Sequence, residues 1–532
     1  MLDCIIKHTH ILDGTGAPGR DADIGIVEGR ISAVGRLDGD AERVIDCEGL
    51  VAAPGFIDIH SHTDSGLLVD PRAESKITQG ITLEVCGNCG FSPAPCIDEA
   101  SRTELESWCK KHAVEADWLT LGDWLDVLES KEIAVNVAVL VGHANVRSAV
   151  VGLANREPSP RELAEMKRLV SEAMEEGAFG LSSGLIYAPS CFADTAELAE
   201  LASAAAPYGG FYASHIRSER DEMVAAVEEA IEVGRRAGVA VEIAHHKACG
   251  SNNWGKVATT LEMVEAARRE GLDVTVDQYP YTAAATSLSI LLPKWAHDGG
   301  RKCLLQRLDD RRNELLRHLQ EAGSDGGSIA NDGGWTTVLV SSVRSDQNRR
   351  YEGMNLVQIA QQRHASPEET ALDLLKEEEL AVSMVHFAQS EEDVRTVMKS
   401  PYAMLGTDAS ARSTTGELAK GKPHPRAFGT FPRVLGRYVN QAGVISLEAA
   451  IRKMTSMPAA KLGISDRGVI RAGNWADIVV FDPGRVIDLA TYEDPHQISR
   501  GVEYVFVNGR LAVERGELTG TLAGRVLRRG RT

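Results

Sequence analysis

A strand, a helix and a second strand follow one another between residues 135 and 183, and this unit decides the fold. It reads VNVAVLVG (135–142), SPRELAEMKRLVSEAMEEG (159–177) and AFGLSS (178–183). The two outer runs are short and apolar, which is typical of buried strands, and the middle run has the pattern of a helix. Strands joined through a helix run parallel, so the unit predicts a parallel sheet covered by helices.

The same unit recurs through the middle of the chain. Candidate strands lie at 55–60, 81–86, 135–142, 178–183, 210–215, 239–245, 272–277 and 402–408. Helical stretches such as SERDEMVAAVEEAIEVGRRAG (218–238) lie between them. Eight strand–helix repeats predict an α/β protein with a TIM-like (β/α)8 barrel over residues 55–467.

One interval between predicted strands is too long for a plain barrel. Asp277 and Asp408 are 131 residues apart, far more than separates any other two neighbouring strands. We expect an insertion at about 286–345, before the last barrel strand, with a charged helical stretch (300–322) and a Gly-rich loop (323–334). Two interpretations stay open, a lid over the site and a surface excursion.

The two ends of the chain predict a different architecture. Residues 1–54 and 468–532 hold short apolar runs separated by turns, and the Glu-Gly pair at 28–29 and the Asn-Gly pair at 508–509 give hairpin signals. Neither end has enough strands for a core of its own. We therefore expect both ends to combine into one small β-sandwich domain.

Composition excludes several classes of protein. The 532 residues carry 76 acidic and 57 basic side chains, a net charge of −19, and no basic run offers a surface for a nucleic-acid backbone. No apolar run approaches the roughly 18 residues of a membrane-spanning helix. The nine cysteines are odd in number and scattered, which favours reduced thiols in the cytoplasm. The oligomeric state leaves no signature in the sequence.

Histidines follow several of the predicted strands. His60 and His62 end the first strand and share one of its faces, the spacing needed to chelate one metal ion. His215 and His245 end two further strands. The carboxyl ends of barrel strands form the rim where such folds keep their active sites. The four rings together therefore predict a metal site at that rim.

Acidic and thiol groups extend this candidate site. Asp408 ends the last strand as a candidate ligand and general base, and Asp277, which ends the seventh strand, competes for that role. Cys86 and Cys89 have the C-x-x-C spacing, but no thioredoxin-like pattern surrounds them, so a single thiolate ligand is favoured over a redox pair. Imidazole with thiolate suits Zn²⁺, and three protein ligands with an open position are typical of catalytic zinc.

Longer motifs connect these residues to a known family. They are GFIDIHSHTD (55–64), GNCGFSPAP (87–95), GLSSGLIYAPS (180–190), SHIRSE (214–219), AHHK (244–247), GTDAS (406–410) and TSMPAAKLGISDRGVIRAGNWADIVVFD (455–482). In these motifs the chain resembles the N-acyl-D-amino-acid deacylases (D-aminoacylases) of the amidohydrolase superfamily, from residue 1 to about 515.

The resemblance implies a tightly bound zinc ion held by Cys89, His215 and His245. A second, weaker metal site would consist of His60, His62 and the bridging Cys89. Of the two cysteines in EVCGNCG (84–90), the first has no role in the family.

The resemblance also assigns proton transfer to Asp408. It implies substrate contacts from Lys247, from Tyr187 and from a tyrosine of the DQYPY segment, either Tyr279 or Tyr281. A lysine close to the metal makes physical sense because its ammonium can hold the α-carboxylate, although an ordinary salt bridge remains the alternative.

The implied activity is zinc-dependent hydrolysis of N-acyl-D-amino acids to a carboxylate and a free D-amino acid. The alternatives are another amidase of the superfamily, acting on a dipeptide, a cyclic amide or a different acylated amine, and a non-catalytic scaffold. The small-molecule substrate would be an anion. An acidic side chain on it would need a second cation, which Arg344, Arg349 or Arg350 of the insertion could supply.

Overall fold

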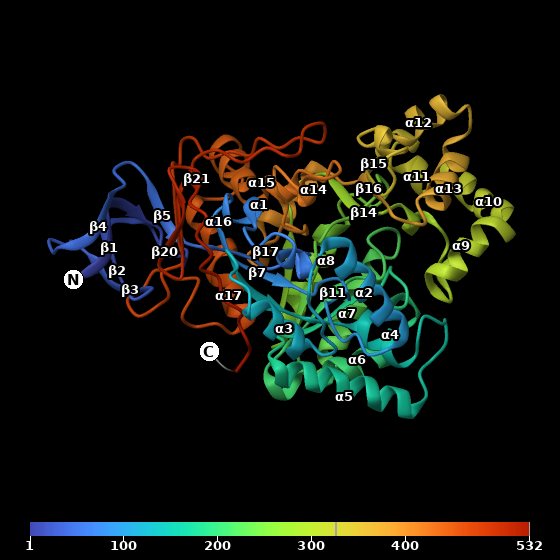
Figure 1. Cartoon of the computed structure of the whole chain (residues 1–532), viewed down its shortest axis with the longest axis horizontal. Helices are drawn as coiled ribbons and strands as arrows, with labels where there is room; N and C mark the ends of the chain where they lie inside the picture. Colours follow the sequence, from blue (N-terminus) through green and yellow to red (C-terminus); the bar gives the residue numbers. More distant parts are fainter. Residues whose placement is uncertain (325–326, 531–532) are drawn as a thin grey trace.

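The computed structural model of the chain describes residues 1–324 and 327–530 and has three parts (Figure 1). They are a β-domain built from both chain ends, a barrel with its helices, and a smaller α/β domain inserted before the last barrel strand. Residues 325–326, in the predicted loop 323–334, and residues 531–532, at the end of the predicted β-domain, lie outside the described residues.

The predicted parallel barrel is present. Its strands are β6 (Phe56–Asp58), β7 (Ile81–Cys86), β8 and β9 (Asn136–Val139 and Val141–Gly142, one predicted strand in two pieces), β10 (Gly180–Gly184), β11 (Phe211–His215), β12 (Ala240–Ile243), β13 (Val274–Gln278) and β17 (Ala403–Leu405). Neighbouring strands pair in parallel, in the orders β6-β7-β8 and β9-β10-β11-β12-β13-β17.

The first and last strands meet at a seam with few backbone contacts. The backbone N–H of Asp408 donates to the carbonyl of His60 at 2.7 Å. Behind this contact the buried ammonium of Lys76 donates to the carboxylate of Asp58 at 2.7 Å and to the carbonyl of Ala409 at 2.8 Å. A buried ion pair thus joins two strand ends that lack a regular ladder.

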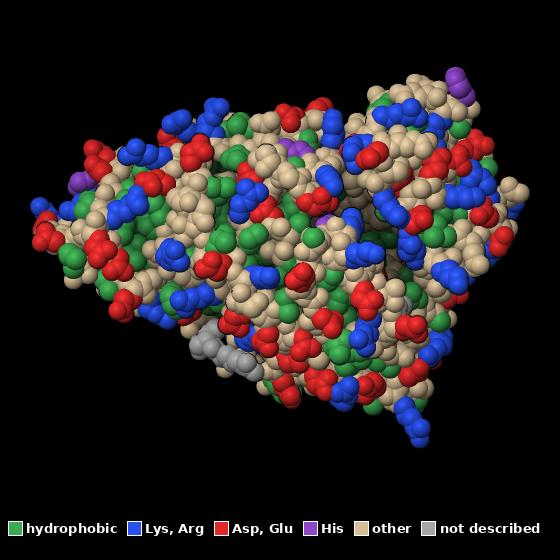
Figure 2. All heavy atoms as spheres, viewed as in Figure 1, with side chains coloured by type: hydrophobic (Ala, Val, Ile, Leu, Met, Phe, Trp, Pro, Cys, Tyr) green, Lys and Arg blue, Asp and Glu red, His purple; other side chains and the backbone are tan. Residues whose placement is uncertain are grey.

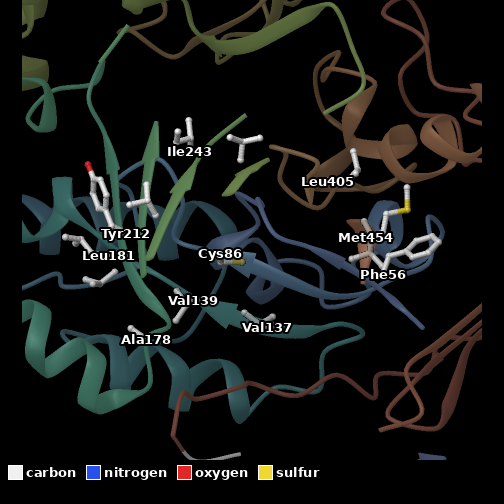
Figure 3. Close-up of a cluster of buried hydrophobic side chains, with 14 of the residues drawn as sticks. Phe56, Cys86, Val137, Val139, Ala178, Leu181, Tyr212, Ile243, Leu405 and Met454 are labelled. Carbon is white, nitrogen blue, oxygen red and sulfur yellow. The ribbon is translucent and has the colours of Figure 1, made fainter. Parts of the chain in front are cut away.

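The barrel strands have two buried faces because successive side chains point to opposite sides. Outward side chains pack under the helices, among them Phe56, Val137, Val139, Leu181, Ile243 and Leu405 (Figure 3). Inward side chains fill the barrel, among them Leu83, Ala138, Phe211, Ala213 and Met404. The inward set turns polar toward the carboxyl ends of the strands, where His215 and Asp277 lie.

Helices follow the barrel strands. They are α1 (Glu74–Ile77), α2 (Glu99–His112), α3 (Leu121–Glu129), α4 (His143–Val150), α5 (Pro160–Glu176), α6 (Thr195–Ser203), α7 (Met223–Ala237), α8 (Lys256–Arg269), α14 (Glu391–Lys399), α15 (Arg426–Arg433), α16 (Leu447–Met454) and α17 (Ser456–Leu462). Helix α5 shows why they begin where they do, since Ser159 and Glu162 form a capping box around Pro160. Within the described residues, no helix is both long and apolar enough to cross a membrane.

The inserted domain is larger than the predicted 286–345. Its sheet has the order β14-β16-β15, with bounds Ala283–Ser287, Val382–Phe387 and Val338–Val343. Its helices are α9 (Gly300–Asp310), α10 (Arg312–Gly323), α11 (Ser328–Asn331), α12 (Leu356–Arg363) and α13 (Pro367–Glu377). It has its own apolar core, which includes Leu308, Leu319, Leu356 and Leu372. The insertion therefore spans 283–387 as a domain.

The β-domain combines both chain ends in a single nine-stranded sheet. The N-terminal strands are β1 (Leu2–Ile11), β2 (Arg20–Val27), β3 (Arg30–Gly35), β4 (Ala41–Asp46) and β5 (Val51–Pro54); the C-terminal ones are β18 (Ile478–Phe481), β19 (Val502–Val507), β20 (Arg510–Glu514) and β21 (Glu517–Leu518). The two halves join where β5 pairs antiparallel with β18. Both predicted hairpins, β2–β3 and β19–β20, are present.

Candidate active site

Two overlapping groups of metal-ligating side chains lie at the carboxyl ends of the barrel strands. One group is His60, His62, Cys89 and Asp408, and the other is Cys89, His215 and His245. Within each group the donor atoms lie within 4.8 Å of one another. The sulfur of Cys89 is 3.3 Å from Nε2 of His60 and 3.5 Å from Nε2 of His245. The fold thus brings together the five metal ligands and the proton-transfer residue that the family resemblance implies.

Left-handed backbone places three of these side chains. The φ angles are 53° at Cys89, 34° at His245 and 49° at Asp408. By strand alternation His245 would point outward with Ile243, and its left-handed φ redirects the ring to the barrel mouth. Such conformations cost non-glycine residues roughly 1–3 kcal/mol each and concentrate at functional sites.

The turn after β7 separates the two cysteines. Gly87 has φ 75°, and a Cβ there would lie 2.0 Å from the carbonyl oxygen of Leu140, so only glycine fits. The turn carries Cys89 to the barrel mouth, whereas Cys86 stays in the outward apolar layer (Figure 3). The thiol of Cys86 has a pKa well above the usual value, chiefly because it is buried. Cys86 is therefore a packing residue in this structure.

The chemistry of the donor set fits a soft divalent cation. Neither ring nitrogen of the buried His215 forms a hydrogen bond within the described residues, which is costly unless another partner is bound. Burial alone would raise the pKa of the Cys89 thiol, but the imidazoles of His60 and His245 hold it well below its usual range. A thiolate beside two imidazoles is a donor set that zinc prefers.

Acidic groups behind the ligands orient their rings. Asp277 accepts from Nδ1 of His60 at 2.9 Å and from the backbone N–H of His245 at 2.9 Å. Glu219 lies 3.0 Å from Nδ1 of His245 and also pairs with Lys247. Such partners fix which ring nitrogen faces a metal. Asp277, the competitor of Asp408 in the sequence, therefore faces the ligands from behind.

Asp408 lies between a histidine and an arginine. One carboxylate oxygen is 3.0 Å from Nε2 of His62, and the other is 2.7 Å from a guanidinium nitrogen of Arg426. Burial alone would raise the pKa of Asp408, but Arg426, followed by His245 and His60, holds it well below its usual range. The carboxylate is thus anionic at neutral pH. The sequence motifs did not single out Arg426.

A cavity of about 240 Å³, the site cavity, opens above these groups. It is lined by all of the candidate ligands except His60, together with Tyr187, Lys247, Tyr279 and Arg426. Of the two candidate tyrosines in DQYPY, Tyr281 does not line it, because its ring packs under the guanidinium of Arg433 at 4.5 Å. The predicted contact from Tyr281 is therefore not supported by the structure.

Two further cavities adjoin the site cavity on either side of β14, where the surface is hollowed between barrel and inserted domain (Figure 2). The apolar chamber, about 520 Å³, has walls that include Ile186, Ile290, Leu291, Leu292 and Met384. The polar chamber, about 180 Å³, has walls that include Ser341, Ser342, Ser383, Ser410, Arg412 and Lys420. Thr286 of β14 lines all three cavities.

The arginines suggested as a second cation lie elsewhere. Arg344 pairs with Glu379, Arg349 pairs with Asp346, and Arg350 lies over the ring of Tyr351. None of the three lines the site cavity or either chamber.

Comparisons with known proteins identify the family of the chain. Residues 43–513 match the model of the amidohydrolase family. The chain is 37% identical to the N-acyl-D-glutamate deacylase of Alcaligenes xylosoxydans xylosoxydans, over 99% of this chain and 97% of that protein. It is 35% identical to the D-aminoacylase of the same organism, over 99% of this chain and 98% of that one.

Solved structures give the same result. The N-acyl-D-glutamate deacylase of Bordetella bronchiseptica, complexed with zinc and a phosphonate mimic of the tetrahedral intermediate, has a TM-score of 0.83 at 33% identity and 99% coverage of both chains. A D-aminoacylase with a binuclear metal centre also scores 0.83, at 35% identity, covering 99% of this chain and 100% of its own. The L-hydantoinase of Arthrobacter aurescens, 18% identical with a TM-score of 0.57, shares the fold. The chain belongs to the amidohydrolase family, in the group of the D-aminoacylases.

Proposed function

We propose that the protein is a zinc-dependent hydrolase that converts N-acyl-D-amino acids into a carboxylate and a free D-amino acid. Membership of the D-aminoacylase group supports this activity. The observation that carries it is one cavity with donors and cations on its walls. His215, whose ring forms no hydrogen bond among the described residues, a thiolate Cys89 and an anionic Asp408 line it beside the cations Lys247 and Arg426.

Zinc held by Cys89, His215 and His245 would polarise the acyl oxygen and lower the pKa of a water molecule. Asp408 supplies the proton transfers. Its anionic carboxylate accepts a proton from the attacking water and then delivers it to the nitrogen of the leaving amine. His62 and Arg426 hold the two carboxylate oxygens in place for both steps.

The substrate carboxylate faces a cluster of polar groups. Two cations lie over the ring of Tyr279. The guanidinium carbon of Arg426 is 4.5 Å from the ring centre, and the ammonium nitrogen of Lys247 is 5.7 Å from the same ring centre. Lys247 pairs with Glu219 and Arg426 pairs with Asp408, so both cations are partly compensated. The planar guanidinium of Arg426 can in addition bind a carboxylate through two parallel hydrogen bonds. Chirality is then read from three points: the carbonyl at the ligands, the α-carboxylate at this cluster, and the side chain.

All nine cysteines are free thiols, and eight of them are buried. This pattern supports a reducing compartment such as the cytoplasm.

The experiment that tests the function compares N-acetyl-D-leucine, N-acetyl-L-leucine and a hydantoin on the purified zinc-loaded protein. We expect release of free amino acid from the D-enantiomer alone. Turnover of the hydantoin, or of the L-enantiomer at an equal rate, would replace the proposal with a cyclic amidase or an unselective amidase. No turnover of any of the three with zinc bound would favour a scaffold.

A further inference from the structure

The polar chamber holds more positive than negative charge. Three cationic side chains line it, Arg412, Lys420 and Arg426, together with one carboxylate, Asp408. His424 also lines it, and burial holds the pKa of its imidazole well below the usual range, so this ring is neutral. The chamber is thus a cationic recess in a chain whose net charge is −19.

The cations differ in what they contact. Arg426 pairs with Asp408 at 2.7 Å, and Lys420 pairs with Glu417 at 2.5 Å. Arg412 is half-buried, and across residues 1–324 and 327–530 its guanidinium has neither a hydrogen bond nor an acidic partner. Burial lowers its pKa with no neighbouring acid to compensate. An arginine withdrawn from water without an anion is costly, so its place in a cavity wall calls for an anionic ligand.

Two serine hydroxyl groups also line the polar chamber. Strand β15 shifts register between Val340 and Ser342, the mark of a bulge, and both Ser341 and Ser342 line the polar chamber. Neither side-chain hydroxyl hydrogen-bonds to any described residue. Two free donors thus face the chamber that Arg412 also lines.

The polar chamber continues directly from the reaction centre. It shares His62, Asp408 and Arg426 with the site cavity. A substrate whose α-carboxylate is bound by Arg426 can therefore extend a second group into this chamber without leaving the active site.

We propose that Arg412, with Ser341 and Ser342, binds a second carboxylate of the substrate. This inference rests on the proposed deacylase function and narrows its substrate class to dicarboxylic N-acyl-D-amino acids. The second carboxylate has two possible sources, an acidic side chain on the amino acid and an acyl group that itself ends in a carboxylate.

The two sources are separated by two matched pairs of substrates. N-acetyl-D-glutamate against N-acetyl-D-glutamine tests the side chain. N-succinyl-D-leucine against N-butanoyl-D-leucine tests the acyl group. In the wild type we expect kcat/KM to favour the acidic member of one pair by about 10- to 100-fold, the range of a charge-assisted hydrogen bond.

Arg412→Gln should abolish that preference by lowering kcat/KM for the acidic member far more than for the neutral member, and Arg412→Lys should retain part of the preference. Arg344→Gln is the matched control, because Arg344 is an exposed arginine that lines none of the three cavities. Thermal unfolding checks that each variant folds. The proposal is overturned if neither pair discriminates in the wild type, or if the preference survives in Arg412→Gln.

Binding separates this inference from the proposed function. Calorimetric titration compares glutarate with butyrate on the zinc-loaded wild type and on Arg412→Gln. We expect tighter binding of glutarate that depends on Arg412, even if no N-acyl substrate is hydrolysed. Turnover of N-acetyl-D-leucine without any advantage for glutarate would keep the deacylase and remove the carboxylate subsite.

Discussion

The apolar and polar chambers both have arginines in their walls, and they differ in what those arginines contact. In the apolar chamber Arg217 pairs with Glu229 at 2.8 Å and Arg220 pairs with Asp332 at 2.7 Å. In the polar chamber Arg412 has no partner among the described residues. A guanidinium whose donors are all engaged has little to offer a ligand carboxylate.

The difference teaches that lining composition alone does not decide what a cavity binds. If only the types of the lining residues were compared, both chambers would be called cationic. Once each arginine is matched to its partner, the apolar chamber offers paired arginines among leucines and isoleucines, with Lys294 over the ring of Phe192. The polar chamber offers an arginine and two serine hydroxyls that have no partner among the described residues. We therefore expect the apolar chamber to accept the hydrocarbon part of the substrate.

The largest expected effect lies at the junction that both chambers share. Asp408→Asn should lower kcat by about 10³-fold on apolar and on dicarboxylic substrates alike, because the amide cannot accept the proton from water. Steady-state kinetics with both substrate types, beside a zinc assay, measures this. A loss confined to one substrate type would show that Asp408 belongs to one chamber, and loss of zinc would recast it as a ligand.

The next effect tests the metal site between the chambers. Cys89→Ser should lose bound zinc and with it turnover of every substrate, whereas Cys86→Ser should keep both, since Cys86 lies in the apolar layer. Metal content by atomic emission after dialysis distinguishes the two variants. Zinc retained by the Cys89 variant and lost by the Cys86 variant would reverse the assignment of the ligand.

A third substitution removes the acidic partner of an arginine in the apolar chamber, so that this arginine becomes unpaired like Arg412. Asp332 is fully buried against Arg220 and His386, so Asp332→Ala should lower the free energy of unfolding by about 3 kcal/mol. Urea denaturation measures the change. Glu379→Ala, which removes the exposed partner of Arg344, is the control and should have little effect. Equal changes in the free energy of unfolding of the two variants would mean that the buried Arg220–Asp332 pair stabilises the fold no more than an exposed pair does.

The smallest expected effect comes from a substitution in the wall of the apolar chamber that leaves every ion pair intact. Ile290→Asp places a carboxylate in the wall of the apolar chamber and should raise KM for N-acetyl-D-leucine about tenfold, because the substrate then meets a charge in place of hydrocarbon. Ile290→Val keeps the wall apolar and serves as the control. An unchanged KM in the Asp variant would place the hydrocarbon of the substrate elsewhere.

The sequence was sufficient for the parts of the molecule that repeat. Apolar runs separated by helical stretches predict each barrel strand, because a parallel strand that is buried on both faces is apolar along its whole length. The histidines at the ends of those strands converge because all carboxyl ends of a parallel barrel lie at one rim. Both hairpins follow from turn residues that tolerate a positive φ.

The sequence was insufficient where the geometry depends on segments without a period. Arg412 lies in the irregular stretch after the last strand, and Arg426 begins α15 at the end of that stretch, so nothing in their spacing predicts which way they face. The predicted insertion, about 286–345, stops short of α12, α13 and β16, because the helices and strands of an inserted domain have the same sequence patterns as those of a barrel. Tyr279 and Tyr281 are two residues apart, so the sequence gives them the same orientation. Only the packing shows that Tyr279 lines the site cavity and that Tyr281 packs against Arg433.

The seam of the barrel has a consequence for synthesis of the chain. His60 and Asp408 meet there through a backbone hydrogen bond although they lie far apart in sequence, and the N-terminal strand β5 pairs with the C-terminal strand β18. Contacts over such separations form late, since they require closure of a very long loop. The candidate ligands of the first strand therefore meet the candidate base Asp408 only after 408 of the 532 residues have been made. A nascent or truncated chain carries histidines without a base, so hydrolytic activity reports completion of the fold.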